Sequence, residues 1–592
     1  MTYFARHAAI ILLLLSGILW ADESNPLLFN PPHGFFGQPF NLTITAPVEP
    51  AQIKYTLNGE NPLTSPNAKS LNSPAIIRID PFSTTERDFA PGVCVRAVAV
   101  SADTAITEVF SQTFMFVDHV AELSRDNQRP GPDWPSPGGG NNRQMMDYGM
   151  DPQVFNDARY RNKMVPALLD VPTLSMVVEL DDLFDPDTGI YMNAVEHGID
   201  WERPCSLELL SPDGSEGFSI NCGVRIRGGW SRQNNNPKHA FRFFFRSEYG
   251  EGKLDYPLFE DEGADEFDKV DLRCPQNYSW SFGGDSRNTF LRDVFSRDLQ
   301  RDMGQPYTRS RYYHFYINGT YWGLFQTQER SEAAFAESYF DGEREDYDVV
   351  KVDGGYGGRP YDIEATDGNL DAWNHLWELC EEGLHTDENY YKVQGLNPNG
   401  TENQNYPKLV DLDNLIDYMI ATFFVGDFDG PISSFSGDVN PNNFYGVYNR
   451  VTPFGFLFFR HDAEHSMWDF RRVDRTGPYP AGSRREKFNP QWLHQKLAEH
   501  PEYRIRFADR AYKHFFNGGA ITEEANVKRW LDRKDEIDLA IIAESARWGD
   551  AKSGSPRTRD NDWLPQVEWA IDHYFPTRND IVLDQLISKN WY

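Results

Sequence analysis

Cysteine is scarce in this sequence, and positive charge is outnumbered by negative charge. Only five of the 592 residues are cysteines, and no two have the Cys-x-x-Cys spacing, so a cysteine-based zinc site is not expected. Lys and Arg number 57 against 89 Asp and Glu, which gives a formal net charge of −32. Such an acidic chain repels phosphate backbones, so a nucleic-acid partner is not expected.

Two kinds of segment are also missing. After residue 20, no stretch approaches the run of about 18 apolar residues that a membrane-spanning helix needs, so no membrane span is expected. There is no Walker-type GxxxxGK[ST] run, and no GxGxxG follows a strand-like segment. The common glycine-rich nucleotide loops are therefore excluded.

Residues 1–21 have the pattern of a signal peptide. Arg6 and His7 precede an apolar run over residues 8–20, and Ala21 provides a small residue before the acidic residues that follow. The run is too short for a stable membrane span, and the whole pattern is typical of Sec-dependent export. We therefore expect a mature protein that is secreted, periplasmic or at the cell surface.

The sequence does contain material for several packed domains. A hydrophobic share of 40% and an aromatic share of 14% suffice for large cores, and 592 residues are too many for a single core. Residues 27–118 hold about eight short strand-like runs separated by turn residues, which predicts an all-β sandwich. Within them, IKYTLNGENPLTSPNA resembles the chitobiase-C-terminal-like, fibronectin-III-associated module. The resemblance implies an accessory unit, with a glycan or a surface protein as partner.

The rest of the chain changes character twice. Residues 119–165 are rich in Pro and Gly, which predicts a linker. Strand-like and helix-like runs alternate over residues 171–515, which predicts an α+β domain. The runs over residues 516–592 are mostly helix-like, which predicts a helical C-terminal extension. Apolar residues at helical spacing predict helices within 288–304 and 409–426.

Two cysteines flank a turn-rich segment. Cys205 and Cys222 lie almost symmetrically around the run PDGSEG. If this run is the turn of a hairpin, the two cysteines face each other and can form a disulfide in an oxidising compartment. The sequence leaves a disulfide and two free thiols equally open.

Three positions carry an isolated charge next to an apolar run. Lys238 opens a strand of alternating basic and aromatic residues, where it could hold anionic oxygens or simply lie on the surface. Glu329 follows an apolar strand, where it could pair with a basic strand residue or begin a solvated helix. Arg292 borders the apolar face of the first predicted helix, and a snorkelling surface arginine also explains it.

The strongest candidate site lies further along the chain. Asp427 and Asp429 directly follow the second predicted helix, a pair of asparagines ends in Asn443, and the strand FGFLFF is followed by RHDAEH at 460–465. Carboxylate and amide oxygens suit a hard cation. The same set suits phosphoryl transfer, in which one Asp orients a hydroxyl while another Asp and an Asn hold Mg²⁺.

Two other chemistries remain open for these residues. His461 and His465 have the i, i+4 spacing of a zinc site, but that motif needs a helix and the preceding run is strand-like. A glycosidase would instead pair Asp429 with Asp462 or Glu464.

Several motifs together resemble the CotH (spore-coat protein H) kinase family over residues 171–515. They occur in the order RIRGGWSR…PKHAFRFFF, FLRDVFSRDLQRDMG, YYHFYINGTYWGLFQTQER, DYDVVK, GDFDG…PNNFYGVYNR and FFRHDAEHSM. The family is a divergent, secreted branch of the protein-kinase-like fold that uses ATP and a divalent metal to phosphorylate proteins. The resemblance therefore implies a kinase-like fold, ATP with Mg or Mn as cofactors, and a protein substrate.

The resemblance also implies roles for acidic and amide residues. Asp429 matches the catalytic Asp of the family, and Asp462 matches its metal-binding Asp. Asn443 and Glu464 match further metal ligands, with Glu464 at a position where a second Asp is usual. The chain also departs from the family pattern at Asp427, which replaces an Asn.

Four further residues match cofactor-binding positions of the family. Lys238 and Glu329 match the phosphate-binding Lys and its acidic partner. Arg292 and Lys351 match positions to which the sequence assigns no individual role.

The expected protein is thus multidomain, with an N-terminal β-sandwich, a kinase-like α+β domain and a helical C-terminal region. We expect a secreted, atypical protein kinase-like enzyme that transfers the γ-phosphoryl group of ATP to hydroxyls of extracellular or surface proteins. The alternative is a non-catalytic surface or matrix protein, with a glycan- or protein-binding sandwich and a degenerate kinase-like scaffold. Asp429 and Asp462 within reach of one cation, with Lys238 facing it, would favour the enzyme, and aspartates that point apart would favour the scaffold.

Overall fold

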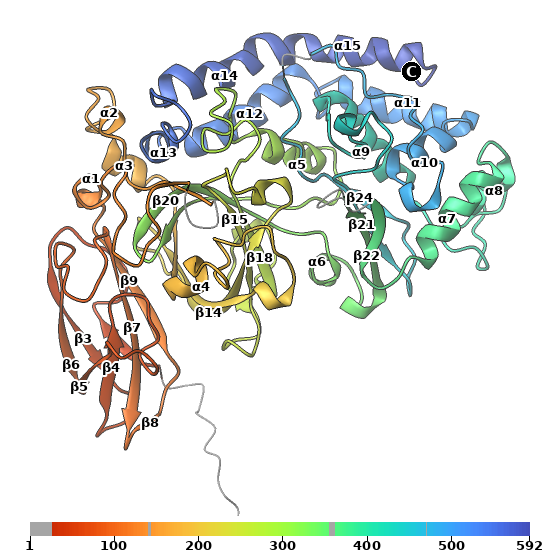
Figure 1. Cartoon of the computed structure of the whole chain (residues 1–592). Coiled ribbons are helices and arrows are strands. Elements are labelled where there is room, and N and C mark those ends of the chain that lie inside the picture. Colours follow the sequence, from red (N-terminus) through yellow and green to blue (C-terminus); the bar gives the residue numbers. More distant parts are fainter. Residues whose placement is uncertain (1–25, 140–143, 355–360, 469–470) are drawn as a thin grey trace, which may run out of the picture.

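The computed structural model describes residues 26–139, 144–354, 361–468 and 471–592. The predicted signal peptide at 1–21 lies outside these described residues. Among the helices of the described part, none is long and apolar enough to cross a membrane. Figure 1 shows a β-rich N-terminal region beside a larger mixed region, with the C-terminal helices along one side of the latter.

The N-terminal region consists of two β-sheets that share a core. Their strand orders are β1-β3-β6 and β2-β9-β7-β4-β5, with β8 paired to β7. In β6, every second residue is buried, as expected for a strand with one face on a core. Side chains from both sheets meet in that core, among them Leu42, Ile77, Val95 and Phe114. The strands are β1 (Leu28–Asn30), β2 (Gly34–Phe35), β3 (Phe40–Thr45), β4 (Gln52–Thr56), β5 (Lys69–Asn72), β6 (Ala75–Ile79), β7 (Gly92–Ser101), β8 (Thr104–Ala105) and β9 (Phe110–Met115).

Residues 119–165 are predicted to be a linker, but the parts of this segment that the structure describes, 119–139 and 144–165, pack against the rest of the molecule. Trp134 and Tyr148 belong to the core of the following barrel, and the Trp134 indole donates to Asp88 at 2.7 Å. The segment is rich in Pro and Gly, and its apolar residues have no helical or strand periodicity, so the sequence predicts a spacer. Each of these two aromatic residues nevertheless buries a large apolar surface. The segment contains α1 (Val120–Leu123), β10 (Gly138–Gly139), β11 (Met145–Met146), α2 (Pro152–Phe155) and α3 (Met164–Leu168).

A closed barrel follows, with strand order β12-β13-β14-β15-β18-β20-β19. Antiparallel pairs build most of it, and the parallel pair of β12 and β19 closes it. Large aromatic side chains fill its interior, including Phe241, Phe315, Trp322 and Phe325. The strands are β12 (Thr173–Val178), β13 (Arg203–Leu210), β14 (Ser219–Arg227), β15 (Ala240–Phe244), β18 (Lys269–Arg273), β19 (Tyr312–Ile317) and β20 (Thr320–Gln328).

The hairpin expected around PDGSEG is formed by β13 and β14. Cys205 and Cys222 are direct cross-strand partners in it. Their Sγ atoms lie 3.5 Å apart, and both residues are free thiols. Burial raises the pKa of Cys222 well above its usual value, so this thiol stays protonated.

A second sheet and two buried helices form the centre of the larger region. The sheet has the order β22-β21-β23-β24. Helix α9 packs against α5, α10, α11 and β24, which explains why its residues are apolar almost all round. The elements are α5 (Arg292–Asp302), α6 (Ala333–Tyr339), β21 (Tyr347–Asp353), β22 (Asp362–Asp367), α7 (Asp371–Glu382), α8 (Asp387–Lys392), α9 (Leu412–Val425), β23 (Tyr445–Asn449) and β24 (Leu457–Phe459).

The C-terminal helices pack onto the same core instead of forming a separate unit. Trp530 and Phe575 both contact Phe295 of α5, with ring centroids 5.6 and 5.5 Å away. In Figure 1 the blue helices lie across the top of the barrel and of α9. They are α10 (Pro490–Leu497), α11 (Pro501–Phe515), α12 (Glu523–Ile537), α13 (Ile541–Trp548), α14 (Leu564–Trp569) and α15 (Phe575–Ser588).

Candidate active site

A cavity of about 780 Å³ lies between the barrel and the second sheet. The barrel contributes residues of β14, β15 and β18, and the sheet contributes residues of β21 and β23. Loops complete the lining, among them those that follow α9, β14, β18 and β24. Five of the eight residues for which the family resemblance implies a catalytic, cofactor or metal position line it: Lys351, Asp429, Asn443, Asp462 and Glu464. The two histidines considered for zinc, His461 and His465, line it as well.

Asp429 reaches the cavity because the chain turns sharply after α9. The helix ends at Gly426, whose φ of +61° is the left-handed conformation that glycine adopts readily at helix ends. One oxygen of the buried Asp427 accepts from the backbone N–H groups of Asp429 and Gly430, each at 3.1 Å. The other oxygen pairs with Arg460. Asp427, which departs from the family pattern, therefore holds the loop in place, and its carboxylate does not face the cavity.

The carboxyl group of Asp429 is held by two polar neighbours. It accepts hydrogen bonds from the Ser433 hydroxyl and, at 3.2 Å, from the Asn443 amide. Burial raises the pKa of Asp429 to about 7, and the nearby charges of Asp427 and Asp462 add to the rise. A carboxyl group with this pKa can accept a proton near neutral pH.

Asp462 and Glu464 follow β24 and share one counter-ion. Both carboxylates pair with the guanidinium of Arg273, which lies at the end of β18. Burial by itself would raise the pKa of Asp462, but the charge of Arg273 outweighs it and lowers that pKa to about 2. Burial dominates for Glu464 and raises its pKa. Asp462 is thus firmly ionised, while the carboxyl of Asp429 on the same cavity sits near its titration midpoint at neutral pH.

Helix α5 fixes the loop that carries Asp462. Asp293 accepts from the backbone N–H of Ala463 at 2.8 Å and from Arg297 at 3.0 Å. It also lies 3.5 Å from the guanidinium of Arg273. Arg273 and Asp293 therefore link the barrel, α5 and the loop after β24, although the sequence alone singled out neither residue.

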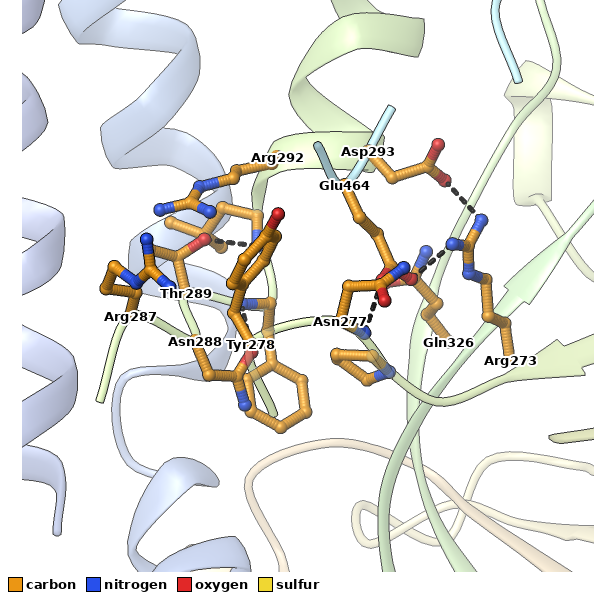
Figure 2. Close-up of a pocket in the computed structure, with 13 residues that line it drawn as sticks. Arg273, Asn277, Tyr278, Arg287, Asn288, Thr289, Arg292, Asp293, Gln326 and Glu464 are labelled. Atoms are coloured by element: carbon orange, nitrogen blue, oxygen red, sulfur yellow. Dashed lines mark hydrogen bonds and ion pairs between the residues drawn. The ribbon is translucent and has the colours of Figure 1, made fainter. Parts of the chain in front are cut away.

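Arg292, the residue of α5 that the family resemblance places at a cofactor-binding position, lies outside the lining of the large cavity. It lines a small adjoining cavity of about 30 Å³, with its guanidinium 5.4 Å from the ring centre of Tyr278. Figure 2 shows Arg292 beside Arg287 and Tyr278, whereas Arg273 lies at the other side of this cavity with Glu464. The structure thus places Arg292 next to the large cavity and not in its lining.

The expected pair of Lys238 and Glu329 does not form. Lys238 is 1% exposed and pairs with Glu544 of α13 at 2.6 Å, while also donating to the Leu324 carbonyl at 2.9 Å. Glu329 instead accepts from Arg309 at 3.0 Å and from the Tyr339 hydroxyl. A carboxylate 306 positions further along the chain neutralises Lys238 inside the core. Neither Lys238 nor Glu329 lines the large cavity, so Lys238 does not face Asp429 and Asp462 as expected.

Three arginines form another part of the lining of the large cavity, called here the arginine wall. Arg227, Arg242 and Arg330 line the cavity, and all three pair with the buried carboxylate of Asp271 on β18. Burial would raise the pKa of Asp271, but the three guanidiniums lower it well below its usual value. The sequence analysis missed this wall, although arginines alternate with aliphatic residues in β14 and Arg242 lies between aromatic residues in β15.

The oxygen donors of the cavity suit a hard divalent cation. Asp462, Glu464 and Asn443 supply carboxylate and amide oxygens, which are the ligands that Mg²⁺ and Mn²⁺ accept. Within the described ranges, no group of three or more His, Cys, Asp and Glu side chains is arranged as a metal site. The two histidines considered for zinc have other neighbours, His461 next to Arg297 and His465 next to Tyr278.

Comparison with known protein families gives one match. The model of the CotH kinase protein family matches residues 224–530, which is just over half of the 592-residue chain. The matched segment includes the loops after α9 and β24 and the arginine wall of the cavity. No curated protein matches the chain.

Proposed function

This chain belongs to the CotH kinase family, and on that premise we propose that it transfers the γ-phosphoryl group of ATP to a hydroxyl of an acceptor protein. One observation carries the proposal. Asp429 and Asp462 come from separate loops, line the same cavity, and have pKa values of about 7 and about 2. Two carboxyl groups whose environments separate their pKa values in this way are typical of a site that divides acid–base and electrostatic roles between them.

Asp429 is the residue that would receive the acceptor hydroxyl. Its ionised carboxylate would accept the hydroxyl proton as the hydroxyl oxygen forms a bond to the γ-phosphorus. The bond between the γ-phosphorus and the β,γ-bridging oxygen breaks in the same transfer, and ADP leaves with that electron pair. Asn443 and Ser433 hydrogen-bond the carboxyl of Asp429 and so fix its orientation.

Asp462 is the residue that would hold a divalent cation, with Glu464 and Asn443 as further oxygen donors. A bound Mg²⁺ or Mn²⁺ would neutralise charge on the transferring phosphoryl group. The low pKa of Asp462 keeps this carboxylate ionised at any physiological pH, as a metal ligand must be.

We further propose that the protein acts outside the cytoplasm on an extracellular or surface protein. The signal-peptide pattern at residues 1–21 supports this location. The β-rich region at 27–118 would then bind a glycan or a protein partner, in line with its resemblance to an accessory module. The family match and the shared cavity favour the enzyme over the non-catalytic scaffold.

A transfer assay tests the proposal. The mature chain is incubated with γ-labelled ATP, Mg²⁺ or Mn²⁺, and dephosphorylated casein as a generic acceptor, and labelled phosphoserine and phosphothreonine are quantified. We expect label on protein, either on casein or on the chain itself, that requires the metal. The matched control Asp532→Asn, at an exposed position that pairs with Lys528 and does not line the cavity, should transfer as the wild type does. A wild-type chain that binds ATP but labels no protein would contradict the proposal.

A further inference from the structure

The arginine wall gathers guanidinium groups from separate strands onto one carboxylate. Arg227 ends β14, Arg242 lies in β15, and Arg330 follows β20. The Nε atom of Arg227 lies 3.0 Å and the Nη1 atom of Arg330 lies 3.3 Å from Oδ2 of Asp271. Arg242 contacts both oxygens of Asp271, with its Nη2 atom 3.1 Å from Oδ2. Asp271 therefore acts as the fixed centre that orients the three arginines.

The cluster has more positive than negative charge. Arg330 also pairs with Glu332, and Glu332 pairs with Lys269. Lys269 also lies 3.6 Å from Asp268, so these pairs give four cations and three carboxylates, and one positive charge is in excess. The side chains are 9% exposed for Arg227, 23% for Arg242 and 11% for Arg330. Excess charge with so little water around it favours an anionic ligand.

The hydrogen-bonding capacity of the cluster points to the same kind of ligand. Each guanidinium carries five N–H donors in a planar fork, whereas a carboxylate offers two oxygens, so donors outnumber the acceptors around Asp271. A phosphate group matches the fork with two parallel hydrogen bonds. Asp271 restricts the three side chains in advance, which lowers the entropy cost of binding.

We propose that Arg227, Arg242 and Arg330 form the subsite that binds the polyphosphate chain of the nucleotide. The inference rests on the proposed function, since it assigns to this wall the phosphates of the nucleotide whose transfer involves Asp429 and Asp462. It also explains how the chain binds phosphate although Lys238 is buried against Glu544. The arginines and the two aspartates line one cavity, so both ends of a triphosphate have partners there.

Calorimetric titration of the mature chain in the absence of divalent metal tests this subsite, with ATP, ADP, adenosine and inorganic tripolyphosphate as ligands. We expect tripolyphosphate to compete with ATP on the wild type. Arg242→Gln and Arg330→Gln should each weaken ADP and ATP by about tenfold or more, the scale of one lost charge-assisted hydrogen-bonded contact, and leave adenosine unchanged. Each variant leaves two arginines on Asp271, so its carboxylate stays neutralised.

Two further variants keep the experiment decisive. Arg246→Gln removes an arginine that pairs with Glu202 outside the cavity lining, and its ADP affinity should equal that of the wild type. Arg242→Lys keeps the charge and loses the fork, and its affinity should be intermediate, with a melting temperature near that of the wild type. Unchanged ADP affinity in both glutamine variants, or no competition by tripolyphosphate, would overturn the subsite and leave the proposed function standing. A wild type that binds no nucleotide with or without metal would overturn the proposed function as well.

Discussion

Arg273 pairs with Asp462 across the boundary between the barrel and the loop that follows β24. The same guanidinium contacts Glu464 and lies 3.5 Å from Asp293 of α5. These contacts hold the ionised carboxylate of Asp462 at the edge of the cavity. The cavity is thus assembled by one buried cation that joins three parts of the chain.

Asp429→Asn should remove phosphotransfer while nucleotide still binds. The amide cannot accept the hydroxyl proton, and loss of a positioned general base typically costs about 100- to 10,000-fold in rate. The measurements are the rate of label transfer and the calorimetric affinity for ADP. A variant that transfers at the wild-type rate would show that Asp429 has no part in the reaction. Asp532→Asn serves as the control, because that residue is exposed on α12 and does not line the cavity.

The transfer rate should rise with pH through about 7. Burial raises the pKa of Asp429 to about 7, so its carboxylate is largely protonated at pH 6 and largely ionised at pH 8. Only the ionised form accepts the proton, and the rate should therefore increase by close to tenfold per pH unit well below the midpoint. A pH–rate profile at saturating ATP checks this. A rate that is flat from pH 5.5 to 8.5 would contradict it.

Arg273→Gln should destabilise the protein, mostly at neutral pH. Removing one partner of a buried ion pair costs about 3–5 kcal/mol in general, because the other charge stays buried and unpaired. The pKa of Asp462 is lowered to about 2 in the folded protein, so the ion pair stabilises the fold fully above about pH 4. This stabilisation is lost as the pH falls toward 2 and Asp462 is protonated. The difference in unfolding free energy between wild type and variant should therefore be largest near pH 7 and should shrink below pH 4. A difference that grows on acidification would contradict this assignment.

Lys238→Met should lower stability and leave nucleotide binding intact. The substitution leaves Glu544 buried without its cation, at a cost of about 3–5 kcal/mol. The double variant Lys238→Met/Glu544→Leu should recover most of that loss, since an apolar pair can replace a buried ion pair. Urea unfolding and ADP titration measure the two properties. Unchanged stability together with lost ADP binding would place Lys238 in the nucleotide site after all. Lys528→Met, at an exposed helix pair, should change stability by less than about 1 kcal/mol.

The helices and loops that carry the site could be predicted where a short stretch of sequence shows the pattern. Apolar residues at helical spacing indicated α5 and α9, and both helices are present. Asp429 and Asp462 were visible as acids placed directly after apolar elements, and both line the cavity. The family match over residues 224–530 confirms the family that the motifs indicated.

The remaining features depend on pairings that no local pattern reveals. The barrel closes through β12 and β19, whose partners Thr173 and His314 are far apart in the sequence. Lys238 finds Glu544 at a separation of 306 positions, and Arg273 finds Asp462 at a separation of 189. The described parts of residues 119–165 are held by single buried aromatic residues such as Trp134, and a composition rich in Pro and Gly does not reveal them. The ion-pair partners and the single buried aromatic residues depend on contacts in the folded chain, so the sequence could not assign them.

The most direct test of a nucleotide site at this cavity is the melting temperature of the mature chain with ATP and Mg²⁺ or Mn²⁺. A ligand at 100 times its Kd stabilises the folded state by about 2.7 kcal/mol, which a melting curve readily detects. We expect ATP to raise the melting temperature in a metal-dependent way, and we expect Asp462→Asn to abolish the metal dependence. No shift at millimolar ATP with either metal would contradict the proposed kinase activity and would favour the non-catalytic scaffold.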